Sequence, residues 1–324
     1  MRIARWVQHG VVSDGFVVDD RVVAFPDGAT VAEVLAGGLA AALELGASAH
    51  AVDGIPLTDV SLLAPLVPAS IRDFVAFEEH VEGVTASIDG VSEVVPEWYE
   101  YPTFYFTNPH TVLATDDVVS PPVTERLDFE LEVGAVIGGV PGRVGSNLTP
   151  ADAAEHIFGY LVFNDWSARD VQGREMKVRL GPCKGKDFGT TLGPWIVTAD
   201  EFASLHDDEG FLPLVMDVAV NGEQVGRDLL SNMGWPFAEL VAYASRNSRV
   251  VPGDVLGSGT AGNGGCLAEL WGRRGELSPP PLATGDEVVM RVEGIGEIRN
   301  VVGAASSVPP IPPARIRPRL RERP

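Results

Sequence analysis

The feature that most constrains this chain is the alternating run Asp128-Phe129-Glu130-Leu131-Glu132, which directly follows Leu127. Successive side chains of a strand point to opposite faces, so a strand here gathers three carboxylates on one face and three apolar residues on the other. Clustered carboxylates repel one another and their pKa values rise. The acidic face must therefore be solvated by water or neutralised by cations, and the run alone leaves both readings open.

A further carboxylate favours the cation. Asp165 lies 33 residues after Glu132, inside Phe163-Asn164-Asp165-Trp166-Ser167-Ala168-Arg169-Asp170. All-oxygen ligation is typical of hard cations, so we expect Mg²⁺, with Mn²⁺ or Ca²⁺ as alternatives. Replacing Glu130 by Gln is then expected to weaken metal binding and to relieve repulsion in the metal-free protein.

Composition limits the class of protein and its partners. The chain has 324 residues, is 45% apolar and has no uninterrupted apolar run near 18 residues, which argues against a membrane span. The N-terminal Met1–Trp6 lacks the apolar segment of a signal peptide, and two cysteines are too few for a disulfide framework, so we expect a cytoplasmic protein. The net charge of −21 argues against nucleic acid and membrane partners. It also disfavours an anionic substrate unless a metal or local Arg and Lys residues reverse the field.

Strand patterns and abundant Val, Gly and Pro predict a mainly β fold of the α+β class. We expect a small α/β N-terminal domain over 1–69, a catalytic domain over 70–304 and a disordered Pro/Arg-rich tail over 305–324. The first domain is predicted to hold strands at 3–8, 16–18, 21–24 and 60–64, a turn at 13–15, and a helix at 30–43 with a Thr30–Glu33 capping box. Beyond it we expect helices at 70–81, 150–156 and 234–246, a loop at 83–100, and strands at 127–138, 157–164, 192–198, 213–221, 251–257, 287–293 and 296–302.

Four segments, in this order, carry a family resemblance. The acidic run and the Asp165 segment are followed by Gly185-Lys186-Asp187-Phe188-Gly189-Thr190-Thr191 and later by a Gly-rich segment that ends in Leu267-Ala268-Glu269-Leu270. Over residues 70–303 this set resembles the fumarylacetoacetate hydrolase superfamily, in particular its two-domain bacterial members. The resemblance implies a β-sandwich roll that binds a divalent metal through Glu130, Glu132 and Asp165, with Asp128 in a structural role.

The resemblance also bears on a fourth ligand. In fumarylacetoacetases an aspartate seven residues before the catalytic histidine completes the metal site. If His110 is that histidine, the position falls on Thr103, which favours the smaller relatives with three carboxylates.

The remaining candidates follow from the chemistry of an oxo acid. A 2-oxo or 1,3-dioxo acid can chelate a metal, which then stabilises the enolate that forms when a carbon–carbon bond breaks. Lys186 would add positive charge beside that enolate. Arg169 and Gln172, one helical turn apart, can bind substrate together, with a bidentate contact from Arg169 to a carboxylate. The Thr260 hydroxyl is a further candidate substrate donor.

Two histidine pairs are candidates for the general base, which needs a pKa near neutrality. His110 with Glu269 resembles the dyad of the fumarylacetoacetases. Glu78 and His80 lie where related enzymes carry a His/Glu pair on a lid helix. Both pairs stay open.

These residues predict a metal-dependent hydrolase that cleaves a carbon–carbon bond in a small 1,3-dioxo or 2-oxo acid. Met176 stands where the resemblance implies a substrate-binding tyrosine, so an acylpyruvate or related diacid is expected rather than fumarylacetoacetate itself. The alternative is a decarboxylase, tautomerase, isomerase or hydratase with the same metal site. A homodimer is expected, as is usual in the family.

Overall fold

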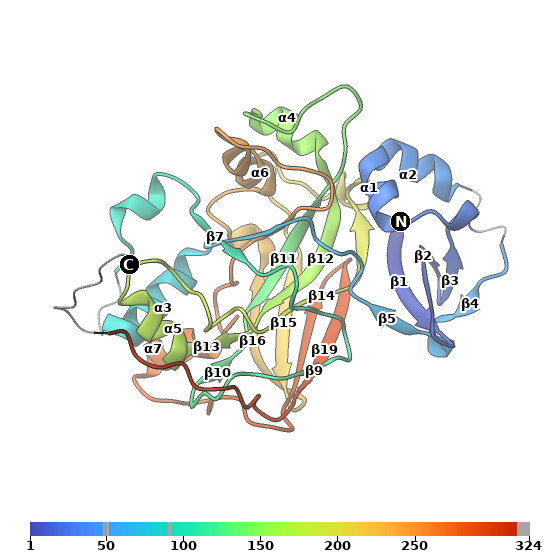
Figure 1. The fold of residues 1–324 in the computed structure, drawn as a ribbon. Coiled ribbons are helices and arrows are strands. Elements are labelled where there is room, and N and C mark those ends of the chain that lie inside the picture. Colours follow the sequence, from blue (N-terminus) through green and yellow to red (C-terminus); the bar gives the residue numbers. More distant parts are fainter. Residues whose placement is uncertain (48, 50–51, 90–92, 316–324) are drawn as a thin grey trace, which may run out of the picture.

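The computed structural model describes residues 1–47, 49, 52–89 and 93–315, and strands dominate it (Figure 1). Two large sheets face each other across a shared core, and neither closes into a barrel. The mainly β, α+β prediction is confirmed.

The larger sheet has 12 strands and a mixed order, β4-β3-β2-β1-β14-β12-β11-β17-β6-β7, with β5 added to β1 and β8 added to β14. Its central strands β11 and β12 are buried along their whole length because the core covers one face and helices and loops cover the other. The strands are β1 (Arg2–Gln8), β2 (Val11–Val18), β3 (Arg21–Ala24), β4 (Ile55–Pro56), β5 (Ser61–Leu63), β6 (Ile71–Phe74), β7 (Phe104–Thr107), β8 (Val112–Leu113), β11 (Leu131–Ile137), β12 (Ile157–Asp165), β14 (Thr190–Thr198) and β17 (Val255–Gly257).

The second sheet has five strands in the order β16-β15-β18-β19-β9, and its apolar face packs on the first sheet. Val133 and Val162 of the large sheet share one core cluster with Met216 and Met290 of the small one. A short antiparallel pair, β10 with β13, lies at the end of β11 and β12. These strands are β9 (Val118–Val119), β10 (Leu127–Asp128), β13 (Ser167–Ala168), β15 (Val215–Val220), β16 (Glu223–Leu229), β18 (Glu287–Val292) and β19 (Gly296–Val302).

Helices collect at three places in Figure 1: α1 and α2 beside the N-terminal strands, α4 with α6, and α3 with α5 and α7 at the end of β10 and β13. The third group flanks the candidate site described below. The helices are α1 (Val31–Gly37), α2 (Leu39–Gly46), α3 (Glu78–Asp89), α4 (Pro150–Glu155), α5 (Arg169–Met176), α6 (Phe237–Ser245) and α7 (Leu267–Arg274), with 3-10 turns η1 (Pro26–Gly28), η3 (Leu57–Asp59), η4 (Pro96–Tyr99), η5 (Ala199–Phe202) and η6 (Leu230–Asn232).

The N-terminal unit extends the large sheet. Strand β1 pairs antiparallel with β14, so strands β1–β5 form one end of that sheet. After β5 the chain crosses to the other end, where β6 pairs with β17. The change of location falls at the predicted domain boundary at 69, and the boundary itself stays a prediction.

One error in the predicted elements matters for function. The segment predicted as a helix over 70–81 is instead strand β6, and helix α3 begins only at Glu78. All four residues of β6 are buried, because it lies between β17 and β7. A short strand buried on both faces shows no period-2 alternation, so its pattern cannot be told from that of a helix. Helix α3 also occupies residues 83–89 of the predicted loop at 83–100, and the 3-10 turn η4 occupies residues 96–99.

Two smaller corrections concern the N-terminal unit. The first hairpin turns at His9-Gly10, where both residues have positive φ, and residues 13–15 lie inside β2. The capping box of Thr30 and Glu33 is confirmed, but the predicted helix over 30–43 divides at Gly38, whose φ is +85°. In the tail, residues 305–315 are exposed without helix or strand, and residues 316–324 lie outside the described residues.

Candidate metal centre and active site

The acidic run does not lie on a solvated face. Asp128, Glu130 and Glu132 are 0%, 3% and 0% exposed, and Asp165 at the end of β12 is 0% exposed. Asp128 belongs to β10 and Glu132 to β11, with Glu130 between the two strands. Buried carboxylates are stable only with partners, so this burial rejects the solvated reading of the sequence.

A carboxylate that sequence reasoning missed completes the cluster. Asp73 of β6 is 2% exposed, and one oxygen each of Asp73, Glu130 and Glu132 lie within 4.8 Å of one another. Strand β17 brings them together because it pairs with β6 on one side and β11 on the other. A Cβ at Gly257 of β17 would lie 2.5 Å from Asp73 Oδ1 and 2.9 Å from Glu132 Oε2, so only glycine leaves room there.

Two buried cations balance part of this charge. Lys186 Nζ donates to Asp165 Oδ2 at 2.6 Å and also pairs with Glu130 Oε2. Arg169 pairs with Glu130 Oε1 at 2.8 Å and with Asp128 Oδ2 at 2.7 Å. These contacts hold the carboxylates in place and occupy both cations.

Asp128 has the structural role that the resemblance implied. Its carboxylate accepts hydrogen bonds from the backbone N–H groups of Leu267 at 2.7 Å and Ala268 at 3.0 Å. These are the first residues of α7, so Asp128 caps that helix at its positive end. The Asp128–Arg169 pair thus ties α7 to α5.

The remaining charge is not balanced by protein groups. Burial, and secondly the Asp165 charge, raise the pKa of Asp73 to about 8. Burial and the Asp73 charge raise the pKa of Glu132 well above its usual value. For Glu130, burial alone would raise the pKa, but Lys186 and Arg169 lower it to about 2. Asp73 and Glu132 therefore have no ion pair with a Lys or Arg in the described part of the chain.

A divalent cation fits this cluster. Asp73 Oδ1 and Asp165 Oδ1 are buried and have no hydrogen-bond partner among the described residues. An all-carboxylate donor set with excess negative charge is the one that Mg²⁺, Mn²⁺ and Ca²⁺ prefer. The residues that can hold it are Asp73, Glu130, Glu132 and Asp165.

A cavity of about 340 Å³ opens beside the cluster. Its wall contains Asp73, Glu130, Lys186 and the imidazole of His80. Tyr105 of β7, which lies opposite Asp73 in the β6–β7 pair, also lines the cavity. Its hydroxyl group donates a hydrogen bond to Asp165. The volume suits a small ligand of a few heavy atoms.

The two candidate histidines differ in their position relative to the cavity. His80 of α3 lines the cavity and is 7% exposed, and burial lowers its pKa to about 4, so the imidazole is neutral at pH 7. His110 is exposed in the loop after β7 and is not part of the cavity wall. Asp73 lies seven residues before His80, which is the family spacing that failed for His110 and Thr103. That spacing was the signal that could have found Asp73.

Glu269 lies under α3 rather than beside His110. It is 0% exposed, it pairs with Arg273 at 2.9 Å, and burial raises its pKa to about 7. His80 instead contacts Cys266, the N-cap residue of α7, with 3.6 Å between Nδ1 and Sγ. Gly83 allows α3 to pack on Glu269, because an added Cβ would lie 3.1 Å from the Glu269 Cα.

Glu78 points away from the cluster. Its carboxylate is exposed and accepts a hydrogen bond from Tyr99, and it lines a separate pocket with Trp98. The structure therefore does not bring Glu78 and His80 together as a pair facing the cavity, although both begin α3.

The predicted substrate residues do lie at the cavity. Gln172 and Thr260 line it with Arg169. Gln172 accepts a hydrogen bond from Arg169 at 3.2 Å, and Thr260 donates to Glu132 at 3.4 Å. Since Arg169 already pairs with two carboxylates, it is less free to bind a third than the sequence suggested.

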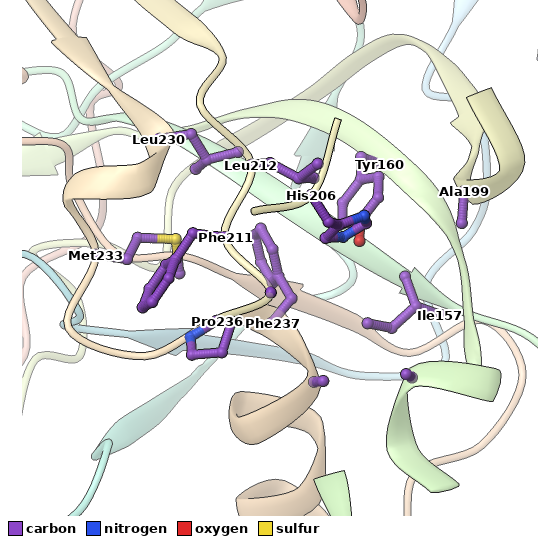
Figure 2. Close-up of a pocket in the computed structure, with 13 residues that line it drawn as sticks. Ile157, Tyr160, Ala199, His206, Phe211, Leu212, Leu230, Met233, Pro236 and Phe237 are labelled. Atoms are coloured by element: carbon purple, nitrogen blue, oxygen red, sulfur yellow. The ribbon is translucent and has the colours of Figure 1, made fainter. Parts of the chain in front are cut away.

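Figure 2 shows a second cavity of about 270 Å³ between β12 and α6. Ile157, Leu212 and Phe237 give it apolar walls, with His206 and Tyr160 as polar groups. No carboxylate lines it, so the metal chemistry belongs to the cavity beside Asp73.

Comparison with known proteins identifies the family of this chain. A family model described as "Fumarylacetoacetate (FAA) hydrolase C-terminal" matches residues 69–303. The chain belongs to the fumarylacetoacetate hydrolase family.

Its relatives perform more than one reaction. A fumarylacetoacetase from Arabidopsis thaliana is 32% identical over 268 residues, which cover 68% of this chain and 63% of the relative, so the match spans less than two thirds of that protein. An oxaloacetate tautomerase from Bacillus subtilis is 27% identical over 76% of this chain and 74% of the relative. A solved maleylpyruvate hydrolase from a Sphingobium species, in complex with manganese(II) and pyruvate, has 22% identity and a TM-score of 0.68 over 94% of this chain and 100% of that chain, which supports the fold.

None of the helices in the described part of the chain combines the length and the apolar character needed to cross a bilayer.

Proposed function

We propose that this chain is a divalent-metal-dependent hydrolase that cleaves a carbon–carbon bond in a small 2-oxo or 1,3-dioxo acid. The observation that carries the proposal is the buried group of Asp73, Glu130 and Glu132, with the buried Asp165 joined to it through Lys186. This group opens on a cavity that also contains Lys186 and a neutral His80. The similarity to fumarylacetoacetases and to a manganese-binding maleylpyruvate hydrolase supports it.

In this proposal Asp73, Glu130, Glu132 and Asp165 hold the ion. When bound, a divalent ion supplies a Lewis acid for the oxygens of a 2-oxo acid. We assign it to Mg²⁺ or Mn²⁺, with Ca²⁺ as the third candidate.

Lys186 and His80 supply the protein's part of the chemistry. Lys186 Nζ keeps a positive charge beside the cavity, because Asp165 and Glu130 raise its pKa despite burial. That charge stabilises negative charge that develops on substrate oxygen. The neutral imidazole of His80 accepts a proton from water, whose oxygen then bonds to the distal carbonyl carbon. The adjacent carbon–carbon bond breaks and the departing carbon takes up a proton, so an acylpyruvate gives pyruvate and a carboxylic acid.

Gln172, Thr260 and Tyr105 are proposed to orient the substrate, since all three line the cavity. Glu269 is proposed to act through α3, on which it packs, rather than by touching the substrate. We assign no role to His110 or Glu78.

A tautomerase, isomerase, decarboxylase or hydratase is the second candidate. It is favoured by the environment of His80, which contacts Cys266 while Glu269 pairs with Arg273. A hydrolase needs a base held for water, whereas these reactions move a proton or a carboxylate on the substrate alone. The similarity to an oxaloacetate tautomerase points the same way.

One experiment separates the two. Purified protein is given acetylpyruvate or oxaloacetate with Mn²⁺ or Mg²⁺, and in parallel with EDTA, and the products are identified. Metal-dependent release of acetate and pyruvate supports hydrolysis. Intact acetylpyruvate together with accelerated enol–keto exchange or decarboxylation of oxaloacetate supports the second candidate, and no turnover despite metal binding rejects both for these substrates.

The homodimer and the cytoplasmic location belong to the proposal as well. They rest on family usage and on the small number of cysteines. The charge of −21 supports the absence of nucleic acid and membrane partners. Sedimentation of the purified protein tests the dimer.

A further inference from the structure

A basic segment borders the mouth of the carboxylate cavity. Residues 174–184 begin in the last turn of α5 and continue into the loop after it, and two of them, Met176 and Pro182, line the cavity. Four further residues of the segment carry positive charge and are exposed: Arg174, Lys177, Arg179 and Lys184. We call these four residues the cationic rim.

The one acid of the segment does not cancel the rim. The Glu175 carboxylate turns inward and accepts hydrogen bonds from the backbone N–H groups of Cys183, Lys184 and Gly185 at 2.9, 2.7 and 3.0 Å. These bonds close the base of the loop, so its ends are fixed beside the cavity. The exposed face of the segment is left positive.

The charge of the cationic rim is opposite in sign to the net charge of the chain. Residues 169–187 contain six Lys and Arg and three Asp and Glu, a net charge of +3, whereas the whole chain carries −21. An acidic surface repels an approaching anion, and a local patch of opposite sign raises the rate of capture there. The rim is therefore the place where an anion meets an attractive field on its way to the cavity.

The cations inside the cavity cannot replace it. Arg169 and Lys186 already pair with Asp128, Glu130 and Asp165. Within the rim, Arg174 donates to a backbone carbonyl and Lys184 pairs with Asp187. The side chains of Lys177 and Arg179 have no hydrogen bond or ion pair with any described residue, so their charges are free to act on a ligand.

We propose that the cationic rim captures anionic substrates for the cavity and favours oxo acids with two carboxylates over those with one. The favourable electrostatic energy scales with ligand charge, so a dianion gains twice as much as a monoanion. This inference deepens the proposed function and rests on it for the substrate class.

The test neutralises the two unpaired charges in a Lys177→Gln/Arg179→Gln variant. The control is Arg21→Gln/Arg143→Gln, which removes the same charge near β3 and α4, away from α5 in Figure 1. With Mn²⁺ bound, kcat/KM is measured for the dianion oxaloacetate and the monoanion acetylpyruvate, corrected for turnover without protein. Binding of oxalate, an unreactive dianion, is measured by calorimetry.

At low ionic strength, on the order of 0.01 M, the Debye length is ~30 Å and the rim acts over its full reach. There we expect the rim variant to lose about tenfold in kcat/KM for the dianion and about threefold for the monoanion. At roughly 1 M salt, where the Debye length is ~3 Å, both losses should fall below about twofold. Oxalate affinity should follow the dianion, and the control should change little.

Equal losses in the rim and control variants, or a loss that does not depend on salt, would overturn the inference. Absence of turnover with either substrate would count against the proposed function alone, since oxalate affinity still tests the rim. Unchanged oxalate affinity at low salt would reject the rim whatever the activity.

Discussion

Replacement of Asp73 by Asn should stabilise the metal-free protein, which is unusual for a fully buried site. Burial and the Asp165 charge raise the pKa of Asp73 from 3.8 to about 8 in the folded state. A carboxyl whose folded pKa is raised favours folding below its unfolded pKa and loses that contribution as pH rises through its folded pKa. The loss therefore falls between about pH 4 and pH 8, and an Asn at this position does not suffer it.

The magnitude follows from the same values. The pKa of Asp73 rises from 3.8 to about 8 on folding, and pH 7 lies about three units above the lower value. At 1.36 kcal/mol per unit, the free energy of folding lost at pH 7 through this carboxyl is at most about 4 kcal/mol. Asp73 shares a hydrogen bond with Glu132, and Asn keeps only part of it, so we expect a net gain of roughly 1–3 kcal/mol. For a chain of this size that corresponds to about 1.5–4.5 °C in Tm.

The assay is thermal unfolding in EDTA between pH 4.5 and pH 8.5, with Mn²⁺ binding by calorimetry in parallel. The difference in Tm between Asp73→Asn and wild type should be small at the acid end and grow toward pH 8. Glu130→Gln is the matched control, because Glu130 pairs with Lys186 and Arg169 and its pKa is lowered to about 2. That variant should lose stability, since it leaves two buried cations short of a partner.

Both variants should bind Mn²⁺ more weakly. A lower Tm of metal-free Asp73→Asn at every pH would refute the view that this carboxylate is repelled by its neighbours. Wild-type Mn²⁺ affinity in both variants would refute the ligand assignment.

Three further predictions concern α3 and α7. His80→Ala should lower kcat by at least about 100-fold with Mn²⁺ affinity retained, whereas His110→Ala should stay within about twofold, as steady-state kinetics can measure. Gly83→Ala should cost roughly 1–3 kcal/mol in urea unfolding and lower kcat, because the added Cβ forces α3 off Glu269. Arg273→Leu should raise the pKa of Glu269 further above about 7, since Arg273 lowers it, and should move the acid limb of the pH–rate profile to higher pH.

Each of these has its own control. Gly173→Ala on α5 adds a Cβ that meets nothing within 4 Å, so it should leave turnover unchanged and raise stability by at most about 1 kcal/mol. Arg273→Lys keeps the charge and should keep the pH profile. An inactive His110→Ala beside an active His80→Ala would reverse the base assignment, and an unshifted profile for Arg273→Leu would remove Glu269 from the rate-determining ionisations.

The carboxylates Glu130, Glu132 and Asp165 could be predicted from sequence because each lies in a short local motif. Asp73 was missed because its segment was predicted as a helix and its place in the cluster depends on the pairing of β6 with β17. Only its spacing of seven residues before His80 pointed to it. Local patterns hold no record of such a pairing, and four buried residues look alike as helix or strand. His80 was only one of two candidates because its position depends on where α3 begins.

The sequence also misjudged Glu130. The alternating carboxylates predicted that Glu130→Gln would relieve repulsion in the metal-free protein. In the fold, Lys186 and Arg169 both form ion pairs with Glu130. Among the residues that the structure describes, no Lys or Arg pairs with Asp73 or Glu132, and burial and the Asp73 charge raise the pKa of Glu132. Which acid is repelled and which is paired depends on side chains from α5 and the loop before β14, and composition cannot show it.

Strand β17 has a consequence for the order in which the molecule assembles. It is inserted between β11 and β6, strands synthesised much earlier, and its Gly257 lies between the carboxylates of Asp73 and Glu132. The cluster therefore forms only when β17 pairs with β6, which closes a loop of most of the predicted catalytic domain. Closing so long a loop has a large entropic cost, which local contacts cannot offset early in folding. Nascent chains that have not yet delivered β17 should have no high-affinity cation site. Metal uptake in a refolding experiment would then report the completion of the fold rather than its beginning.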